Sequence, residues 1–251
     1  MSLREERQRR ILTTHVGSLP RPQSLSAKLF ARMSGQNYDA KALGDELHQA
    51  VGDIVKKQAE LGVDIVSDGE LSKTSFQYYV TDRLSGLEPF KPKPGVRATM
   101  ENQNFPTFYK DGSHSGTQPT RYACTGPLKY VGQKQLQADI QNLKDGLKGA
   151  SPAGVFMPSV SPSSCVGLME NRHYKDDEEH LYAVADALSE EYRAIAAAGF
   201  IVQIDDPRLV MNYMLNPGTT VEQHRAWVQK RIAALNHALK GIPAEQVRHH
   251  T

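Results

Sequence analysis

One arrangement of residues occurs twice in this sequence, and it limits the folds that the chain can adopt. In each copy a helical pattern ends at a glycine, a short apolar run follows, and an aspartate comes six residues after the glycine: Gly62 and Asp68 in one copy, Gly199 and Asp205 in the other. Glycine is common at the ends of helices, and short apolar runs are typical of buried strands. Such helix–strand alternation predicts a parallel sheet covered by helices.

Further segments continue this alternation. Residues 11–16, 122–125, 154–158 and 247–251 are predicted to be strands, which makes six with the two copies above. A TIM (β/α)8 barrel often occupies a chain of this length but needs eight strands. The sequence therefore predicts an α/β fold of TIM-barrel type with about six of its eight β/α units, in a single incomplete domain over residues 1–251. Apolar residues at the spacing of one helical face predict helices around residues 43–55, 136–147, 181–195 and 227–239.

Residues from about 86 to 120 interrupt the alternation. This stretch is rich in proline and glycine, which end helices and strands and favour turns. Long segments without regular structure are uncommon inside compact domains and often serve a binding site. We therefore expect an inserted loop or small hairpin over the mouth of the barrel.

The composition argues against several classes of protein. Thirty Lys and Arg residues against 28 Asp and Glu leave a formal net charge of +2, and no basic run indicates a nucleic-acid partner. No apolar stretch is long enough for a membrane span, and the polar start is unlike a signal peptide. The two cysteines, Cys124 and Cys165, form neither a CxxC motif nor a disulfide framework. The expected class is a cytoplasmic enzyme without a membrane or nucleic-acid partner.

Two adjacent carboxylates, Asp205 and Asp206, end the predicted strand that begins near Phe200 and precede Pro207. Neighbouring strand residues point to opposite faces, so one of the two should face a core or pocket. An ionised carboxylate there is costly unless a positive group binds it. The pair therefore indicates a site for a substrate ammonium group or a catalytic acid. The structural alternative is a turn or a helix N-cap, where Asp is favoured.

Three segments together resemble one enzyme family. They are residues 13–22 (TTHVGSLPRP), 66–70 (VSDGE) and 203–207 (QIDDP), and residues 125–127 (TGP) are similar to a further family segment. In order and spacing they resemble the catalytic barrel of cobalamin-independent methionine synthase, especially its shorter single-barrel relatives. The resemblance runs from about residue 11 to the last residue. Each motif alone is weak, and their joint order is what makes the resemblance specific.

This resemblance implies an S-methyltransferase of methionine biosynthesis, in which zinc activates the thiol of homocysteine as methyl acceptor. It implies that Glu70 and Asp205 hold the amino group of homocysteine, and that the turn at Gly17 and Ser18 receives its carboxylate. An ammonium between two carboxylates and a carboxylate against turn N–H groups are both favourable pairings. The methyl donor, methyl-folate or another compound, and the catalytic acid stay unidentified.

Zinc is the cofactor that the resemblance implies, and the sequence contains only part of its site. The family's ligands begin with a His-x-Cys at the end of strand six, where His250 would be the first ligand and the cysteine would follow Thr251, the last residue. Neither Cys124 nor Cys165 is at a ligand position. A catalytic zinc usually has about three protein ligands. We therefore expect a chain truncated after strand six, with zinc in the intact parent protein and not in this polypeptide.

Other functions stay open at this point. A zinc thiol-alkyltransferase resembling epoxyalkane:coenzyme M transferase is one alternative, although two carboxylates favour an ammonium-bearing substrate. A catalytically inactive, truncated barrel is another, because open strand edges invite pairing with a second chain, including a homo-oligomer. A decarboxylase of the uroporphyrinogen type is disfavoured, since its arginine-rich site has no clear counterpart.

Single residues also have structural alternatives. Glu70 follows Asp68-Gly69, a common turn pair, and could be a solvated loop acid. Asp206 fits a cap or a supporting residue better than a ligand-binding one. His15 either contacts the substrate or holds the end of the first strand through hydrogen bonds. His250 could belong to a solvated tail.

Overall fold

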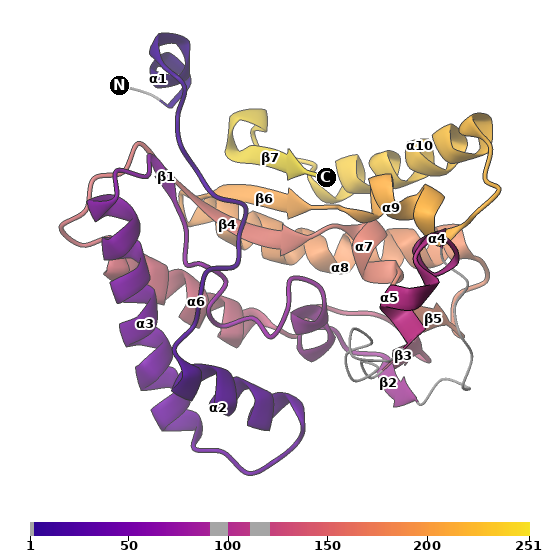
Figure 1. The fold of residues 1–251 in the computed structure, drawn as a ribbon, viewed down its shortest axis with the longest axis horizontal. Coiled ribbons are helices and arrows are strands. Elements are labelled where there is room, and N and C mark those ends of the chain that lie inside the picture. The colour runs from indigo at the N-terminus through magenta and orange to yellow at the C-terminus, as the bar shows by residue number, and fades with distance from the viewer. Residues whose placement is uncertain (1–2, 91–99, 111–120) are drawn as a thin grey trace.

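A four-stranded parallel sheet is the frame of this computed structural model, which describes residues 3–90, 100–110 and 121–251 (Figure 1). Its strands are β1 (Ile65–Val66), β4 (Gly154–Val160), β6 (Ile201–Asp205) and β7 (Val247–His250). They lie side by side in the order in which they occur along the chain, as strands of a TIM-type barrel do. The predicted first strand is reduced to a single parallel bridge between Thr14 and Ile65.

Four long helices pack around this sheet, each where the apolar spacing predicts one. They are α3 (Ala40–Glu60), α6 (Gln133–Gly146), α8 (Asp177–Ala197) and α10 (Val221–Ala238). Each long helix places apolar residues in the core, and α8 packs directly against β4 and β6. Asp176 begins α8 by accepting hydrogen bonds from the backbone N–H groups of the first turn, which are otherwise unpaired.

Shorter helices complete the described fold. Two of them follow strands at the end of the sheet where the pocket lies: α7 (Pro162–Val166) after β4, and α9 (Arg208–Leu215) after β6. Such loops after parallel strands are where α/β proteins place their ligand sites. Further short elements are α1 (Leu3–Arg9), α2 (Gln23–Met33) and the 3-10 turns η1 (Tyr78–Asp82) and η2 (Ala244–Gln246).

A second, smaller sheet corrects one strand prediction. It consists of β2 (Leu87–Phe90), β3 (Arg121–Cys124) and β5 (Met169–Asn171), with β3 antiparallel to β2 and parallel to β5. The predicted strand at 122–125 is therefore present, but β1 pairs directly with β4 and does not contact it in the main sheet. The reason is local: the backbone N–H groups of Thr125 and Gly126 donate to the carbonyl of Gly86, at 2.9 and 3.3 Å, and tie this strand to β2.

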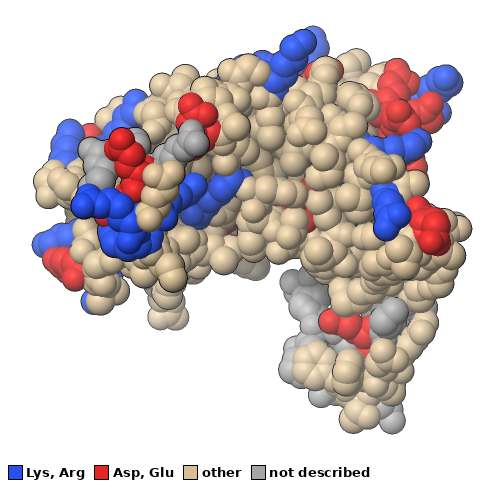
Figure 2. Space-filling model, turned by 90° about the horizontal axis from the view of Figure 1, so that it is seen from above, with Lys and Arg blue, Asp and Glu red and all other residues tan. Residues whose placement is uncertain are grey.

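The expected insertion at about 86–120 falls partly outside the described residues. Within it the structure describes β2 and two short helices, α4 (Met100–Asn104) and α5 (Pro106–Lys110). Residues 91–99 and 111–120 lie outside the described part, so the boundaries of the insertion stay a prediction. No helix in the described part is both long and apolar enough to cross a membrane. Charged side chains of both signs are interspersed on the face shown in Figure 2, in keeping with the small net charge.

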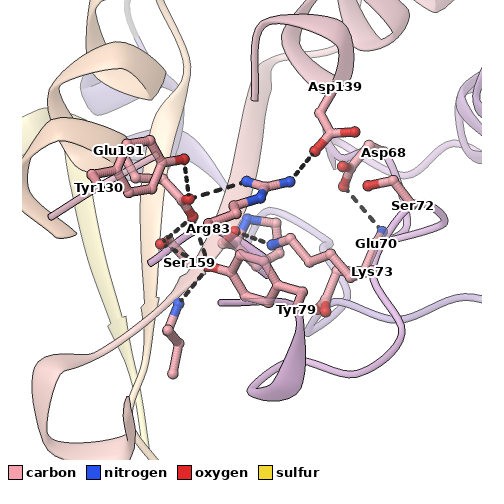
Figure 3. A network of polar contacts seen from close by, with 12 residues as sticks. Asp68, Glu70, Ser72, Lys73, Tyr79, Arg83, Tyr130, Asp139, Ser159 and Glu191 are labelled. Carbon is pink, nitrogen blue, oxygen red and sulfur yellow. Dashed lines mark hydrogen bonds and ion pairs between the residues drawn. The ribbon is translucent and has the colours of Figure 1, made fainter. Parts of the chain in front are cut away.

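A buried polar network connects α8 to the segment that follows β1 (Figure 3). Glu191 on α8 is its centre, and Arg83 donates to Glu191 at 3.0 Å and to Asp139 on α6 at 2.5 Å. Burial alone would raise the pKa of Glu191, but the charges of Arg83 and Lys73 and its hydrogen bonds outweigh burial and hold the pKa at about 2. Three hydroxyl groups also donate to Glu191, those of Tyr79, Tyr130 and Ser159.

This network should contribute strongly to stability, because removing one partner leaves the other charge buried and unpaired. We expect Arg83→Met to lower the free energy of unfolding by about 3–5 kcal/mol, measured by urea denaturation followed by circular dichroism. Tyr130→Phe removes a single hydrogen bond and should cost about 1–2 kcal/mol, which keeps the test informative if the first variant does not fold. Lys41→Met breaks a pair whose lysine side chain is 85% exposed and should change stability little. Equal effects of R83M and K41M would contradict this role.

Candidate functional site

A pocket of about 350 Å³ lies at the carboxyl ends of the parallel strands. This volume is in the range of small-molecule sites. All five residues predicted as site residues line it: Gly17, Ser18, Glu70, Asp205 and His250. That they bind a ligand stays a prediction, but the fold brings them to one place from four separate segments. The other lining residues are His15, Val16, Leu19, Phe76 and Pro207.

Asp205 is the last residue of β6 and is 4% exposed. Its Oδ1 atom accepts a hydrogen bond from Gln203 Nε2 at 2.7 Å and lies 3.0 Å from His250 Nδ1. The strand register explains the second contact, because β6 and β7 pair Asp205 with His250. Burial raises the pKa of Asp205, and the hydrogen bond from Gln203 offsets part of that effect. Among the described residues, both side-chain hydrogen bonds of Asp205 go to Oδ1.

Gln203 and Arg248 support Asp205, and sequence reasoning missed both. Gln203 also donates to the carbonyl of Val16 at 2.5 Å, and it accepts from Arg248 Nε at 2.6 Å. Arg248 donates further to Thr14 Oγ1 at 3.1 Å. The network thus connects β6 and β7 to the first segment of the chain. A signal for Gln203 was present, because a residue two positions before Asp205 on a strand shares its face.

Glu70 follows β1 in an unusual backbone conformation. Its φ of 55° makes it the one non-glycine residue with positive φ in the described part of the chain. The side chain is 2% exposed, and its Oε2 atom has no hydrogen-bond partner among the described residues. The alternative of a solvated loop acid is therefore wrong. Burial raises the pKa of Glu70, while the charge of Lys73 lowers it. Conformational strain at a buried, unpaired carboxylate is typical of a functional position.

Glycine at position 17 leaves room for the Glu70 carboxylate in its present position. A Cβ atom on Gly17 would lie 2.0 Å from Glu70 Oε1, far inside any contact distance. The turn is also tied to the loop after β1, since the N–H group of Leu19 donates to the carbonyl of Gly69 at 3.0 Å. Ser18 is exposed at the rim of the same pocket. The first and second motifs of the sequence therefore form one wall of the pocket together.

His15 is held by hydrogen bonds, as one of its two alternatives expects, and its contact with a substrate stays a prediction. Its Nε2 atom lies 2.8 Å from Gln58 Oε1, so the ring is fixed by a hydrogen bond, and the residue also lines the pocket. Burial lowers the pKa of His15, which favours a neutral ring near pH 7. His15 is therefore a hydrogen-bonded residue in the wall.

Asp206 is turned away from the pocket. It is buried, its Oδ1 accepts from Ser164 Oγ on α7 at 3.1 Å, and its Oδ2 lies 3.8 Å from His249 Nε2. No side-chain cap forms at the start of α9, so the cap alternative is wrong. Asp206 instead supports the packing of α7, as the strand alternation with Asp205 requires.

The described residues do not form a metal site, and His250 as a zinc ligand stays a prediction. No group of three or more His, Cys, Asp or Glu side chains there is placed to hold a metal ion. His250 fits the role of one ligand, because a metal-bound histidine usually gives its second ring N–H to a carboxylate, as Nδ1 can give it to Asp205. Cys124 and Cys165 are buried, on β3 and α7, and line no part of the pocket. These donors do not complete a zinc site, which needs about three protein ligands.

Comparison with known proteins identifies the family of this chain. A family model described as the catalytic domain of cobalamin-independent synthase matches residues 11–145, more than half of the chain. The chain belongs to this family. Protein YxjH of Bacillus subtilis, which has no assigned function, is 28% identical over 76% of this chain. A methionine synthase of Saccharolobus islandicus is 24% identical over 94% of it.

Solved structures of the family share the fold. A B12-independent methionine synthase from a Shewanella species, in complex with selenomethionine, superposes with a TM-score of 0.67 at 22% identity and covers 95% of this chain. A putative enzyme of the same kind from Listeria monocytogenes gives a TM-score of 0.66 at 19% identity. The barrel-type α/β fold predicted from the sequence is thereby confirmed. The chain spans 47% of the Bacillus protein, 61% of the Saccharolobus protein and 60% of the Shewanella chain.

The buried carboxylate of Glu70 should lower the stability of the protein. Burial raises the folded-state pKa of Glu70, so the folded chain takes up a proton more readily than the unfolded one. Above that pKa the carboxylate is ionised, and the cost of the buried charge lowers the free energy of unfolding. We expect Glu70→Gln to raise the free energy of unfolding by about 1 kcal/mol at neutral pH. This gain should shrink as the pH falls through the raised pKa, measured by urea denaturation across the acidic range.

The control for this prediction is Glu60→Gln, at an exposed position near the end of α3. It should show no such gain and no such pH dependence. If E70Q instead lowers the free energy of unfolding by the same amount at every pH, the buried charge of Glu70 does not destabilise the folded protein.

Proposed function

We propose that this chain contains the amino-acid site of a zinc-dependent S-methyltransferase that acts on homocysteine. The observation that carries the proposal is the pair of buried carboxylates in one pocket, Glu70 and Asp205. Glu70 Oε2 has no hydrogen-bond partner among the described residues. Asp205 uses Oδ1 for Gln203 and the imidazole of His250, and no described lysine or arginine pairs with either acid. Two such carboxylates are complementary to a ligand ammonium group.

The proposed orientation of homocysteine follows from the donors and acceptors of the pocket. Its ammonium group would lie between Glu70 Oε2 and Asp205 Oδ2, two carboxylate oxygens that accept no hydrogen bond from the described residues. Its carboxylate would face the N–H groups and the hydroxyl of the Gly17–Ser18 turn. Its thiol would then point toward His250, one of the two histidines that line the pocket and the one expected to bind a metal.

The same charges disfavour the coenzyme M alternative. A thiol that carries a sulfonate and no ammonium would place a negative group in a pocket with two buried carboxylates, which is electrostatically unfavourable. The Shewanella relative was solved with selenomethionine, an amino acid of the same class as homocysteine. This supports an amino-acid ligand in the pocket.

The complete reaction is also part of the proposal, because the chain spans about half to two thirds of its relatives. We propose that His250 would hold one position of a zinc ion, which would supply activation of the thiol. The residues described here bind and orient the amino acid. The methyl donor, methyl-folate or another compound, is not assigned to any residue.

The amino-group assignment can be tested with two ligands that differ only in that group. We expect wild-type protein to bind homocysteine more tightly than sulfanylbutanoate, its desamino analogue, in calorimetric titrations under reducing conditions. Glu70→Ala and Asp205→Ala should each weaken homocysteine binding by about 10- to 100-fold, the usual effect of losing a charge-assisted hydrogen bond. Binding of the analogue should change little.

The control variant is Asp53→Ala, which removes an exposed carboxylate on α3 and should leave both affinities unchanged. Unchanged homocysteine affinity in the double variant E70A/D205A would rule out the amino-group assignment.

Zinc binding offers a separate test of the ligand set. No three donor side chains among the described residues of the pocket are placed to hold one metal ion together, whereas a catalytic zinc requires about three protein ligands. We expect weak, substoichiometric zinc binding by this polypeptide in a competition titration with a chromophoric chelator, and a further loss in His250→Ala. Tight binding of one zinc per chain would contradict this expectation.

A further inference from the structure

Arg21 binds three backbone carbonyl groups of a single loop. Its Nη2 atom donates to the carbonyls of Glu70 and Lys73 at 2.6 and 2.7 Å, and its Nε atom donates to that of Leu71 at 3.2 Å. The planar guanidinium fork is suited to such a set of acceptors, which a lysine ammonium could not match in the same geometry. Among the described ion pairs, none includes Arg21. Its polar contacts are therefore directed at the backbone of this loop.

The loop that Arg21 binds has a conformation that its sequence does not favour. Gly69 and Glu70 are consecutive residues with positive φ, 63° and 55°, and this region is unfavourable for a residue with a side chain. Two other contacts assist Arg21: Asp68 Oδ1 accepts from the backbone N–H group of Glu70 at 3.0 Å, and the backbone N–H group of Lys73 donates to the carbonyl of Glu70 at 3.0 Å. A strained conformation of this kind persists only where its surroundings hold it.

Arg21 acts from outside the pocket. It does not line the pocket that contains Glu70 and Asp205, although Gly17, Ser18 and Leu19 of the same motif do. Arg21 is therefore not placed to contact a ligand in that pocket directly. Its contacts reach the ligand through the loop, whose backbone conformation decides where the Glu70 carboxylate points, and its charge also acts on that carboxylate.

We propose that Arg21 is a positioning residue for ligand selectivity: by binding the carbonyls of residues 70, 71 and 73, it holds the Glu70 carboxylate where a ligand ammonium group is received. This inference rests on the proposed function and extends it to a residue that the pocket itself does not include. Arg21 should thus affect the preference for amino-group-bearing ligands, and not binding in general.

Arg32 supplies a matched control for this role. It lies on α2 and donates to the same loop, but through one long hydrogen bond, from Nη2 to the carbonyl of Ser72 at 3.3 Å. Its removal takes away an arginine and a contact with this loop, but leaves the carbonyls of Glu70, Leu71 and Lys73 bound by Arg21. A difference between the two arginine variants would therefore report the role of those three carbonyls.

The test compares homocysteine with sulfanylbutanoate in calorimetric titrations of four proteins: wild type, Arg21→Met, Arg21→Lys and Arg32→Met. We expect R21M to bind homocysteine about 10-fold more weakly, with the affinity for sulfanylbutanoate unchanged. R21K should fall between R21M and wild type, because it keeps the charge but not the fork. R32M should behave as wild type. In the E70A background, R21M should have no further effect on homocysteine binding.

Each contrary outcome has a separate meaning. Wild-type protein that does not distinguish the two ligands would overturn the proposed function, and this inference with it. Wild-type selectivity that R21M retains would overturn the inference alone. An equal loss of affinity for both ligands in R21M would also overturn it, because that is the effect of general damage to the pocket. If R21M does not fold, the selectivity of R21K decides by the same criteria.

Discussion

Buried carboxylates are the constraint on which most of this structure depends, because each must be compensated after it is removed from water. Glu191 receives an arginine and three hydroxyl groups, and its low pKa reflects that complete set of partners. Asp205 has one amide donor and one histidine, both at Oδ1. Glu70 has an oxygen without any partner among the described residues. Glu191 thus has a full set of partners, whereas each of the two pocket acids keeps a carboxylate oxygen that a ligand can use.

The sequence pattern predicted the local structure well where one physical signal dominates. A glycine that ends a helix, followed by a short apolar run, correctly placed β1 and β6 and the acids at their carboxyl ends. It could not decide between Asp205 and Asp206, because strand alternation states only that the two face opposite sides. The resemblance of the segments around Gly17 and Glu70 to one family favoured Asp205. The structure places Asp205 in the pocket and Asp206 behind it.

What could not be predicted depends on contacts between distant segments. The pattern at residues 122–125 correctly predicted a strand but not its partner, because pairing with β2 depends on the close backbone contact of Gly86 and Gly126. The partners Arg83 and Glu191 are 108 positions apart. In the sequence Glu191 looks like any charged residue on the surface of a helix. Only the folded chain shows that it is buried, because neither composition nor periodicity distinguishes a buried carboxylate from an exposed one.

The position of His250 links the two halves of the proposed chemistry. Parallel pairing of β6 and β7 sets His250 directly beside Asp205, so the residue expected to bind zinc and a residue expected to bind the amino group share one hydrogen bond. If Nδ1 donates its hydrogen to Asp205, the lone pair of Nε2 is left for a metal. Asp205 then has two tasks, which its two oxygens can divide: Oδ1 orients the imidazole, and Oδ2 remains for the ligand ammonium. Loss of Asp205 should therefore disturb both the amino-group site and the orientation of His250, whereas loss of Glu70 should affect the amino group alone.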